Sequence, residues 1–297
     1  MQVVRTKADL QHLLDAHRKA YFAQHGHLSS HIGFVPTMGA LHAGHLSLVS
    51  AAKATCDMVV ASVFVNPTQF NDVTDFDKYP STPEQDINLL AGAGCDVAFM
   101  PSADEIYGKQ GGSGKPGALI EFRFAGLDDR WEGSSRPGHF SGVALVLSKL
   151  FHILRPTHVY MGQKDYQQLA VVRQLVTLLD FDLAVVGVPT MREPDGLAMS
   201  SRNVRLSAKA RAKAPALYQA LQSVAELATR VSADQACQEA ITKHLADPDF
   251  QVDYLALVHP QDLAPIQQPD PSAGAVVLIA VWLDGVRLID NLIIAPK

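Results

Sequence analysis

Through its first two thirds, the chain alternates short apolar segments with segments of helical periodicity. The apolar runs, which predict buried strands, are residues 32–35, 58–65, 95–100, 157–161 and 183–188. The helical segments are residues 43–55, 84–93, 141–154 and 166–179. Strands separated by helices pair in parallel through right-handed crossovers, and helices cover both faces of such a sheet. We therefore predict an α/β fold with a Rossmann-like parallel sheet.

The pattern changes after about residue 190. Residues 207–245, rich in Ala and Leu, predict two helices. Three strands are then expected without helices between them, at 253–258, 275–283 and 286–294. Asp284-Gly285 is a strong signal for a two-residue hairpin turn between the last two. We therefore expect a Rossmann-like domain over residues 1–189 and a smaller α+β domain with a short antiparallel sheet over residues 190–297.

Charge and apolar content exclude several classes of protein. The net charge is -5, which disfavours a nucleic-acid partner. The first nine residues lack the apolar core of a signal peptide, and the most apolar run, 275–283, is too short to span a bilayer. The 3 cysteines are far apart, which disfavours a disulfide framework. These features predict a cytoplasmic protein that binds neither nucleic acid nor membrane.

The strongest candidate site follows the first predicted strand, at residues 35–45. In open parallel sheets, ligands bind outside the carboxyl ends of the strands. His42 and His45 are three residues apart, so they share one face of the predicted helix, and Gly44 between them leaves the backbone open. The start of a helix favours a phosphate group. Two ordinary histidines or a zinc pair are the alternatives, although no third zinc ligand is apparent.

Three further polar segments follow later predicted strands. Asn66 and Gln69 offer neutral amides suited to hydroxyl and carboxylate groups. The segment 162–168 places Lys164 within reach of a phosphate, Asp165 beside ribose hydroxyls, and Gln168 one helical turn later. The segment 199–203 combines two hydroxyl groups with an arginine, which together can hydrogen-bond to a phosphate group. Each segment taken alone is also consistent with a loop or helix cap.

A glycine-rich stretch at residues 108–117 superficially resembles a phosphate-binding P-loop. It lacks a glycine five residues before Gly114, and Pro116 stands where that motif requires Ser or Thr. We therefore predict a surface loop there.

Residues 38–45, Met-Gly-Ala-Leu-His-Ala-Gly-His, resemble the His-x-Gly-His element of the nucleotidylyltransferase and class I aminoacyl-tRNA synthetase superfamily. Residues 199–202, Met-Ser-Ser-Arg, resemble its second phosphate loop, which usually bears a lysine. With residues 64–70 and 162–168 added, the chain is similar to the pantothenate synthetase (pantoate–β-alanine ligase) family from about residue 3 to residue 294. Four motifs in the right order make this a specific resemblance.

The resemblance implies an AMP-forming carbon–nitrogen ligase. Such an enzyme condenses pantoate with β-alanine to give pantothenate through a pantoyl adenylate, with release of pyrophosphate and AMP. ATP would be a substrate, Mg²⁺ would bridge its oxygens without an assigned protein ligand, and the family suggests a homodimer. The sequence shows no Ser-His-Asp or Cys-His nucleophile candidate, which agrees with this route.

Site residues follow from the same resemblance. Catalytic roles are implied for His45 as proton donor, His42, Lys164 and the backbone of Met38. ATP binding is implied for Met38, Gly39, His42, Gly44, His45, Gly162, Gln163, Lys164, Asp165, Met191, Met199, Ser200, Ser201 and Arg202. Pantoate and β-alanine binding is implied for Gln69, Gln168 and Asn66.

The chain departs from the family at Gln163, where a glutamate is usual. An amide there would weaken Mg²⁺ binding if the carboxylate holds the metal, and would suffice if the residue only orients Lys164; we favour the second. Two other functions share these motifs. One is a nucleotidylyltransferase that stops at a nucleotide adduct, and the other is a nucleotide-binding module without catalysis.

Overall fold

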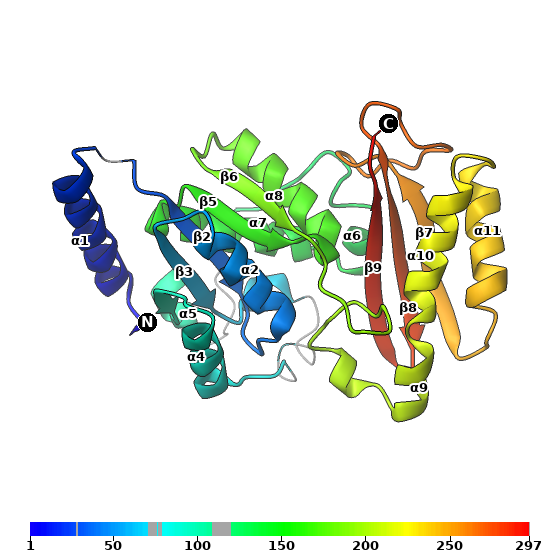
Figure 1. Ribbon diagram of the computed structural model, residues 1–297, viewed down its shortest axis with the longest axis horizontal. Helices are drawn as coiled ribbons and strands as arrows, with labels where there is room; N and C mark the ends of the chain where they lie inside the picture. The colour runs from blue at the N-terminus through cyan, green and yellow to red at the C-terminus, as the bar shows by residue number, and fades with distance from the viewer. Residues whose placement is uncertain (28, 71–75, 77–78, 109–119, 297) are drawn as a thin grey trace. The chain divides into compact units, whose positions relative to one another are not determined.

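The computed structural model describes the chain except for residues 28, 71–75, 77–78, 109–119 and 297. The described residues group by their contacts into two compact units (Figure 1). Unit 1 comprises Met1–Gly162 and Val171–Val188, and unit 2 comprises Gln163–Ala170 and Pro189–Lys297. Most of the predicted glycine-rich surface loop, residues 109–117, lies outside the described residues.

Unit 1 is built on a parallel sheet. Its strands are β1 (Gln2–Val4), β2 (Ile32–Thr37), β3 (Met58–Val63), β4 (Val97–Phe99), β5 (His158–Gly162) and β6 (Ala184–Val188). Among the described residues these six strands lie in the order β1-β4-β3-β2-β5-β6, and every neighbouring pair is parallel. The direction of winding reverses between β2 and β5, and such a reversal is where open α/β sheets bind ligands. The predicted Rossmann-like sheet is confirmed.

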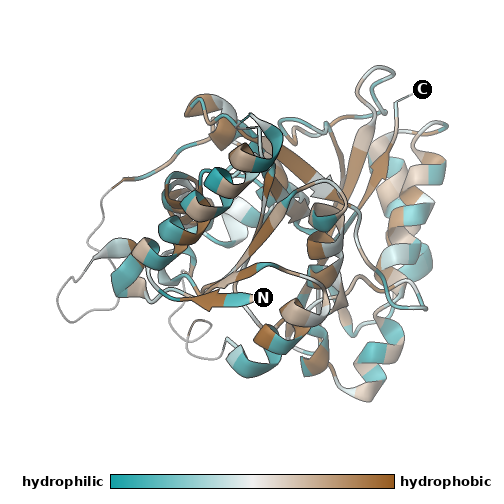
Figure 2. Ribbon diagram, turned by 60° about the vertical axis from the view of Figure 1, so that its left-hand side comes forward, coloured by the Kyte–Doolittle hydropathy of each residue, from teal (hydrophilic) through white to brown (hydrophobic). Residues whose placement is uncertain are grey.

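Helices cover this sheet as the alternating sequence pattern requires. The helices of unit 1 are α1 (Lys7–His25), α2 (Ala43–Lys53), α4 (Pro83–Gly92), α5 (Ala103–Tyr107), α6 (Glu132–Ser135) and α7 (His139–Leu154). Helix α2 packs on β2, β3 and β5 and contacts α4, whereas α1 contacts α7. Figure 2 shows apolar strands and helices with both apolar and polar residues. Apolar side chains of α2 and β3, such as Val49 and Val59, are fully buried against each other's elements.

Strand β1 and helix α1 were not among the elements predicted from the sequence. Thr6 caps α1, since its hydroxyl accepts the Asp9 N–H at 3.1 Å, and Gly26 ends the helix in the left-handed region at φ 75°. Leu10 and Leu14 are its buried residues. The capping signals were therefore present in the sequence, but the apolar stripe is narrow and easily missed.

Unit 2 carries an antiparallel sheet packed on helices. Its elements are α9 (Ala208–Lys213), α10 (Ala216–Leu227), α11 (Ala233–His244), β7 (Phe250–Val258), β8 (Ala275–Leu283) and β9 (Val286–Ile294). Within the described residues, three strands form the sheet in the order β7-β8-β9. Residues of one sheet face, including Val277 and Ile279, form a core with Leu221 and Val224 of α10. The predicted small α+β part with an antiparallel sheet is confirmed.

Two details of unit 2 differ from the sequence expectation. The segment predicted as two helices contains three in the described chain, because Ala214-Pro215 separates α9 from α10. Strand β7 begins at Phe250, three residues before the expected start, and its pairing shifts between Val252 and Tyr254. The hairpin signal is correct: Asp284 and Gly285 have φ values of 54° and 69°, as a type I′ turn requires.

Helix α8 (Tyr166–Leu178) begins in unit 2 and ends in unit 1. Cys56, Cys95 and Cys237 are all buried and free. None of the helices in the described part of the chain combines the length and apolarity that a membrane crossing requires.

Candidate active site

The two histidines of the first motif lie at the start of α2. His42 is the N-cap, with Nδ1 accepting the Gly44 N–H at 3.1 Å, and Nδ1 of His45 accepts the His42 N–H at 3.3 Å. The ring centroids are 4.1 Å apart. Because Nδ1 accepts a hydrogen bond in both rings, the neutral tautomer of each carries its proton on Nε2. Both rings therefore have an Nε2–H donor beside a helix N-terminus, an arrangement suited to an anion.

The turn between β2 and His42 is held by hydrogen bonds to Asp86. Gly39 and Ala40 have φ values of 84° and 50°, so two consecutive residues are left-handed. Asp86 of α4, only 1% exposed, accepts the Ala40 N–H at 3.1 Å and the Leu41 N–H at 2.8 Å. A Cβ at Gly39 would lie 2.9 Å from the Asp86 carboxylate. The close approach of Asp86 and the positive φ together explain why glycine occupies position 39.

The second motif lies at the 3-10 helix η1 (Pro67–Gln69), which follows β3. Gln69 donates through Nε2 to the sulfur of Met38 at 2.7 Å, so this motif contacts the first. Asn66 Nδ2 donates to Gln69 Oε1 at 3.2 Å and to the Gly142 carbonyl at 3.2 Å. Asn66 Oδ1 accepts from the Tyr107 hydroxyl at 2.7 Å, and Asn66 is only 1% exposed. Both ends of the Asn66 amide thus have protein partners.

Helix α7 packs against η1. His139 Nδ1 lies 2.9 Å from the Gln69 carbonyl oxygen. A Cβ at Gly142 would lie 2.2 Å from the Thr68 carbonyl oxygen, so only glycine permits this backbone contact. Burial raises the pKa of Tyr107 to about 12, so its hydroxyl remains a donor to Asn66 throughout the neutral range.

The third motif forms the 3-10 helix η2 (Gln163–Asp165) and the start of α8 in unit 2. The Asn291 side chain of β9 donates to the carbonyl oxygens of Gln163 and Lys164 at 2.8 and 2.7 Å. Lys164 and Gln168 are half-buried, and Asp165 is exposed. Among the described residues, a Cβ at Gly162 would meet no atom within 4 Å, so space is left beside this residue.

The fourth motif follows a short hairpin. The Met199 N–H donates to the Met191 carbonyl at 3.0 Å, and the Glu193 N–H donates to the Leu197 carbonyl at 2.8 Å. Arg192 forms a bidentate pair with Asp290 at 2.6 and 3.0 Å and donates to the Gly196 carbonyl at 3.1 Å. Burial raises the pKa of Asp290, while the Arg192 guanidinium acts in the opposite direction. The hairpin that leads to the fourth motif is thereby tied to β9.

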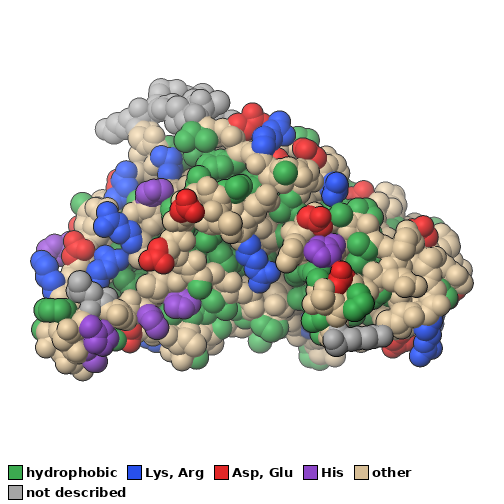
Figure 3. All heavy atoms as spheres, turned by 90° about the horizontal axis from the view of Figure 1, so that it is seen from above, with side chains coloured by type: hydrophobic (Ala, Val, Ile, Leu, Met, Phe, Trp, Pro, Cys, Tyr) green, Lys and Arg blue, Asp and Glu red, His purple; other side chains and the backbone are tan. Residues whose placement is uncertain are grey.

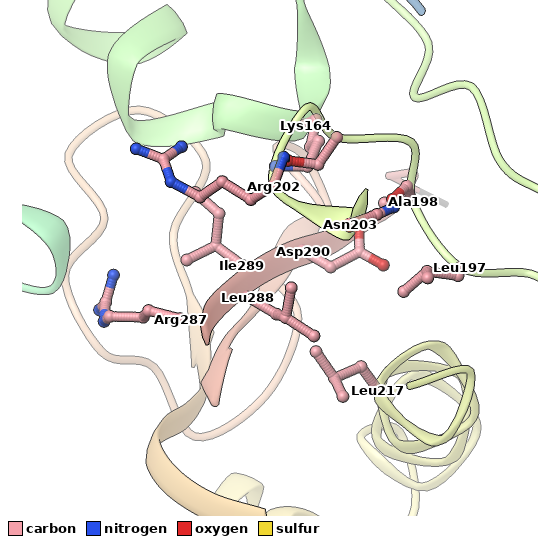
Figure 4. Close-up of a pocket in the computed structure, with 11 residues that line it drawn as sticks. Lys164, Leu197, Ala198, Arg202, Asn203, Leu217, Arg287, Leu288, Ile289 and Asp290 are labelled. Atoms are coloured by element: carbon pink, nitrogen blue, oxygen red, sulfur yellow. Dashed lines mark hydrogen bonds between the residues drawn. The ribbon is translucent and has the colours of Figure 1, made fainter. Parts of the chain in front are cut away.

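A small, partly open cavity in unit 2 brings the third and fourth motifs together (Figure 4). Its lining residues are Lys164, Leu197, Ala198, Ser200, Arg202, Asn203, Leu217, Arg287, Leu288, Ile289 and Asp290. In Figure 4, Lys164 and Leu217 lie at opposite ends of the cavity. Lys164, Arg202 and Arg287 contribute cationic side chains to it, of which Arg287 is paired with Asp253 at 2.7 Å, and the Asp290 carboxylate is paired with Arg192. The cationic groups outnumber the carboxylate, which favours an anionic ligand.

Comparison with known proteins decides the family. The model of the pantoate–β-alanine ligase family matches residues 2–293. The chain belongs to the pantoate–β-alanine ligase family. The prediction of a ligase of this family is therefore confirmed.

Individual members of the family match along most of their length. A pantothenate synthetase from Acinetobacter baumannii is 48% identical over 264 residues, 89% of this chain and 90% of the relative. One from Cytophaga hutchinsonii is 45% identical over 279 residues, covering 93% and 96%. The crystal structure of pantothenate synthetase from Thermus thermophilus superposes with a TM-score of 0.86 at 44% identity, covering 100% of both chains.

A further relative carries ligands in its crystal. The pantoate–β-alanine ligase from Francisella tularensis, complexed with β–γ ATP and β-alanine, has a TM-score of 0.76 at 33% identity. The match covers 99% of this chain and 97% of that one.

Within each unit, the structure brings together only part of the predicted site. In unit 1, His42 contacts His45, and Met38 contacts Gln69. In unit 2, Lys164, Ser200 and Arg202 line one cavity. The other site residues predicted in this unit are not among its lining residues: Gln163, Asp165, Gln168, Met191, Met199 and Ser201. Met191 is 41% exposed.

Several supporting residues were missed in the sequence analysis. They are Asp86, Tyr107, His139, Gly142, Arg192, Asp290 and Asn291. One signal was available: Asp86 lies four residues before Leu90 and therefore on the apolar face of α4. Asp290 and Asn291 likewise interrupt residues 288–294, which are otherwise apolar. A polar residue at a core position implies a buried hydrogen-bond partner.

The donor set for a metal is sparse. Within the described part of the chain, no three His, Cys, Asp or Glu side chains gather closely enough to hold a metal ion. Mg²⁺ in nucleotide sites needs only one or two carboxylates beside substrate phosphates, and Asp165 is an exposed carboxylate next to Lys164. These residues fit a Mg²⁺ ion that is held mainly by ATP.

Proposed function

We propose that this ligase condenses pantoate with β-alanine through a pantoyl adenylate, releasing first pyrophosphate and then AMP. The observation that carries the proposal is the gathering of Lys164, Ser200 and Arg202 around one cavity. Family membership supports the overall reaction, and the Francisella tularensis relative complexed with β–γ ATP and β-alanine supports the two ligands.

The proposed chemistry has two displacement steps. A carboxylate oxygen of pantoate attacks the α-phosphorus of ATP, and the bond to the pyrophosphate oxygen breaks. The amine of β-alanine then attacks the acyl carbon, the bond to the AMP oxygen breaks, and the amine loses a proton. Adenylation turns a poor leaving oxygen into a good one, so the protein's task is alignment and stabilisation of charge.

In unit 1, we assign the phosphate contacts to the Nε2–H groups of His42 and His45. His45 was predicted as a proton donor; because its Nδ1 accepts the His42 N–H, the role that we propose is a hydrogen bond from its Nε2–H to the departing pyrophosphate. The backbone N–H of Met38 contributes near the reacting group. Gln69 holds pantoate and lies near β-alanine. Asn66 was predicted to bind substrate, but its 1% exposure favours a role in fixing the Gln69 amide.

In unit 2, we assign the ATP phosphates to Lys164 and to the segment Ser200, Ser201 and Arg202. Asp165 accepts from the ribose, the Met191 main chain meets adenine, and Gln168 holds pantoate. The remaining proposed ATP contacts come from Gln163 and Met199 in unit 2 and from Gly39, Gly44 and Gly162 in unit 1. The open space beside Gly162 supports close approach of the nucleotide.

Mg²⁺ enters this proposal with ATP, as a neutraliser of phosphate charge. Gln163 need not hold the metal. The Asn291 bond to its carbonyl favours a role for this segment in orienting Lys164.

A homodimer in the cytoplasm, with small molecules as ligands, completes the proposal. The relatives are bacterial biosynthetic enzymes. On the face in Figure 3, the described cationic and anionic side chains are interspersed and form no continuous field of one sign. This distribution and the net charge of -5 disfavour nucleic acid as a partner.

The decisive experiment separates the two steps by substrate omission. With Mg²⁺-ATP, pyrophosphate release is expected only when pantoate is added, and AMP release only when β-alanine is added as well. Lys164→Ala should slow pyrophosphate release by about 10²-fold, because a preorganised charge donor is lost. Lys209→Ala removes an exposed cation of the same unit and should leave the rate unchanged.

Three results would contradict the proposal. Pyrophosphate release that needs a different acceptor would indicate a nucleotidylyltransferase. Nucleotide binding without turnover at saturating substrates would indicate a non-catalytic module. A Lys164→Ala variant with the rate of Lys209→Ala would remove the cavity from the proposed chemistry.

A further inference from the structure

Two adjacent polar residues lie in the interior of β9. Asp290 is 5% exposed and Asn291 is 4% exposed, on a strand whose other buried residues are apolar. Adjacent strand residues point to opposite faces, so these side chains reach different segments. Burying a charge and an amide is costly unless both are fully bonded. Their presence therefore requires a structural or functional reason.

Asn291 uses its amide to hold the backbone of the Lys164 segment. Its Nδ2 donates to two consecutive carbonyl oxygens, those of Gln163 and Lys164, at 2.8 and 2.7 Å. Two bonds from one nitrogen to neighbouring peptide groups restrict the first turn of η2. The direction in which the Lys164 side chain leaves the backbone is restricted with it.

Asn291 is itself held in place. Its backbone carbonyl oxygen accepts from the Arg192 guanidinium at 3.2 Å, and its backbone N–H donates to the Asp290 carboxylate at 2.8 Å. Arg192 is fixed in turn by the bidentate pair with Asp290 and by the Tyr218 ring, 3.8 Å from the guanidinium carbon. The backbone of Asn291 is therefore fixed, and so is the position from which its side-chain amide donates.

We infer that Asn291 is a positioning residue that fixes Lys164 for its contact with ATP. This inference rests on the proposed function, which gives Lys164 a nucleotide ligand. Lys164 and Asp290 line the same cavity as Ser200 and Arg202 (Figure 4). Asn291 touches none of the groups assigned to ATP except through the backbone it holds. Its effect on the reaction must therefore pass through the segment of Gln163 and Lys164. Lys164 carries the cation of that segment, so we expect the effect to depend on the Lys164 side chain.

The test is a double-mutant cycle between Asn291→Ala and Lys164→Ala. Two quantities are measured for each protein: the rate of pyrophosphate release and the Kd of a non-hydrolysable ATP analogue. With Lys164 present, Asn291→Ala should weaken both by about 10-fold, because groups that act as a unit are strongly coupled. In the Lys164→Ala background, the same substitution should change them by less than about 2-fold.

Two further variants separate positioning from general destabilisation. Asn291→Leu keeps the size of the side chain without a donor or a charge, and should reproduce the cycle if Asn291→Ala fails to fold. Val224→Ala creates a small cavity in the fully buried core of α10, and should leave the Kd unchanged in both backgrounds. All measurements are made where urea titration shows each variant folded.

Equal losses from Asn291→Ala in both backgrounds would overturn the inference and leave the proposed function intact. Absent pantoate-dependent pyrophosphate release from the unmodified chain would instead overturn the proposed function. In that case the cycle in Kd still decides the inference. If Lys164→Ala binds the analogue as tightly as the unmodified chain, the inference is overturned as well.

Discussion

Asp86 accepts the Leu41 N–H at 2.8 Å through one carboxylate oxygen and the Ala40 N–H at 3.1 Å through the other. The turn it holds contains two left-handed residues, Gly39 and Ala40. Left-handed alanine is strained, and such a conformation persists only where the surroundings enforce it. The carboxylate of Asp86 thus determines how the chain enters α2, where the two histidines of the site lie.

Asp86→Asn should separate turn geometry from side-chain size. The amide keeps the shape but offers one acceptor, so one backbone N–H loses its partner. We expect the unfolding free energy to fall by about 1–3 kcal/mol. Misplacement of His42 should slow pyrophosphate release by about 10-fold or more, measured by rapid quench.

Asp96→Asn is the matched control. Asp96 also accepts a backbone N–H, that of Val59 at 2.7 Å, but it lies before β4, at the amino end of the strands. Its loss should lower stability without a comparable change in rate. Equal rate effects from the two variants would refute the role of Asp86.

Gly142→Ala should disturb the packing of α7 against η1. The added Cβ would come within 2.2 Å of the Thr68 carbonyl oxygen, and a backbone group cannot move aside cheaply. We expect a loss of about 3 kcal/mol or more in unfolding free energy. In the fraction that folds, the KM for pantoate should rise because η1 carries Gln69. A variant with unchanged Tm and KM would show that α7 does not constrain η1.

Gly162→Ala, unlike Gly142→Ala, should leave stability unchanged and weaken the binding of ATP. Within the described residues no atom lies within 4 Å of the position that the added methyl group would take, so the Tm should be unchanged. If the nucleotide approaches the backbone here, the KM for ATP should rise by about 10-fold while the KM for pantoate stays constant. Steady-state kinetics with each substrate varied in turn checks this, and an unchanged KM for ATP would exclude close approach.

Tyr107 should make stability decrease at high pH. Its pKa is raised by burial to about 12 in the folded chain, against about 10 in an unfolded one. The folded state therefore keeps the proton longer, so this contribution is complete below about pH 10 and is lost as the pH rises to about 12. Two pKa units correspond to about 3 kcal/mol.

Comparison with Tyr107→Phe isolates this effect. The unfolding free energies of the two proteins, from urea titrations between about pH 9 and about pH 11.5, should converge as the pH rises. Parallel curves would mean that Tyr107 ionises normally. At neutral pH, Tyr107→Phe also removes the donor to Asn66 and should raise the KM for pantoate modestly.

The sheet and the motif positions could be predicted because they depend on local signals. Apolar runs such as 58–65 identify strands, and the residues that follow them lie at the carboxyl edge whatever the remaining packing is. The register of β2 with β3 could not be read from the sequence, although it sets Thr37 level with Val63 and so brings Met38 and Gln69 into contact. Register depends on side-chain packing between segments far apart in the chain.

The residues that support the site could not be predicted from the sequence for a similar reason. Asn66 is a plausible substrate ligand in sequence, but Tyr107 and Gly142, 41 and 76 residues away, occupy its amide. Asn291 lies 127 residues from the lysine whose carbonyl it holds. A sequence pattern shows that a polar residue interrupts an apolar strand, whereas its partner is known only after the chain has folded.

Asp290→Asn should be strongly destabilising. The substitution removes the charge that Arg192 faces at 2.6 Å, and the Asp290 side chain is only 3% exposed. Removing one partner of a buried pair costs about 3–5 kcal/mol, because the other charge stays buried without compensation. The control is Asp195→Asn, whose pair with Arg211 has side chains 42% and 33% exposed and should contribute at most about 1 kcal/mol. Urea denaturation of both variants gives the two losses, and equal small values would mean that water reaches Arg192 and that β9 is not anchored by this pair.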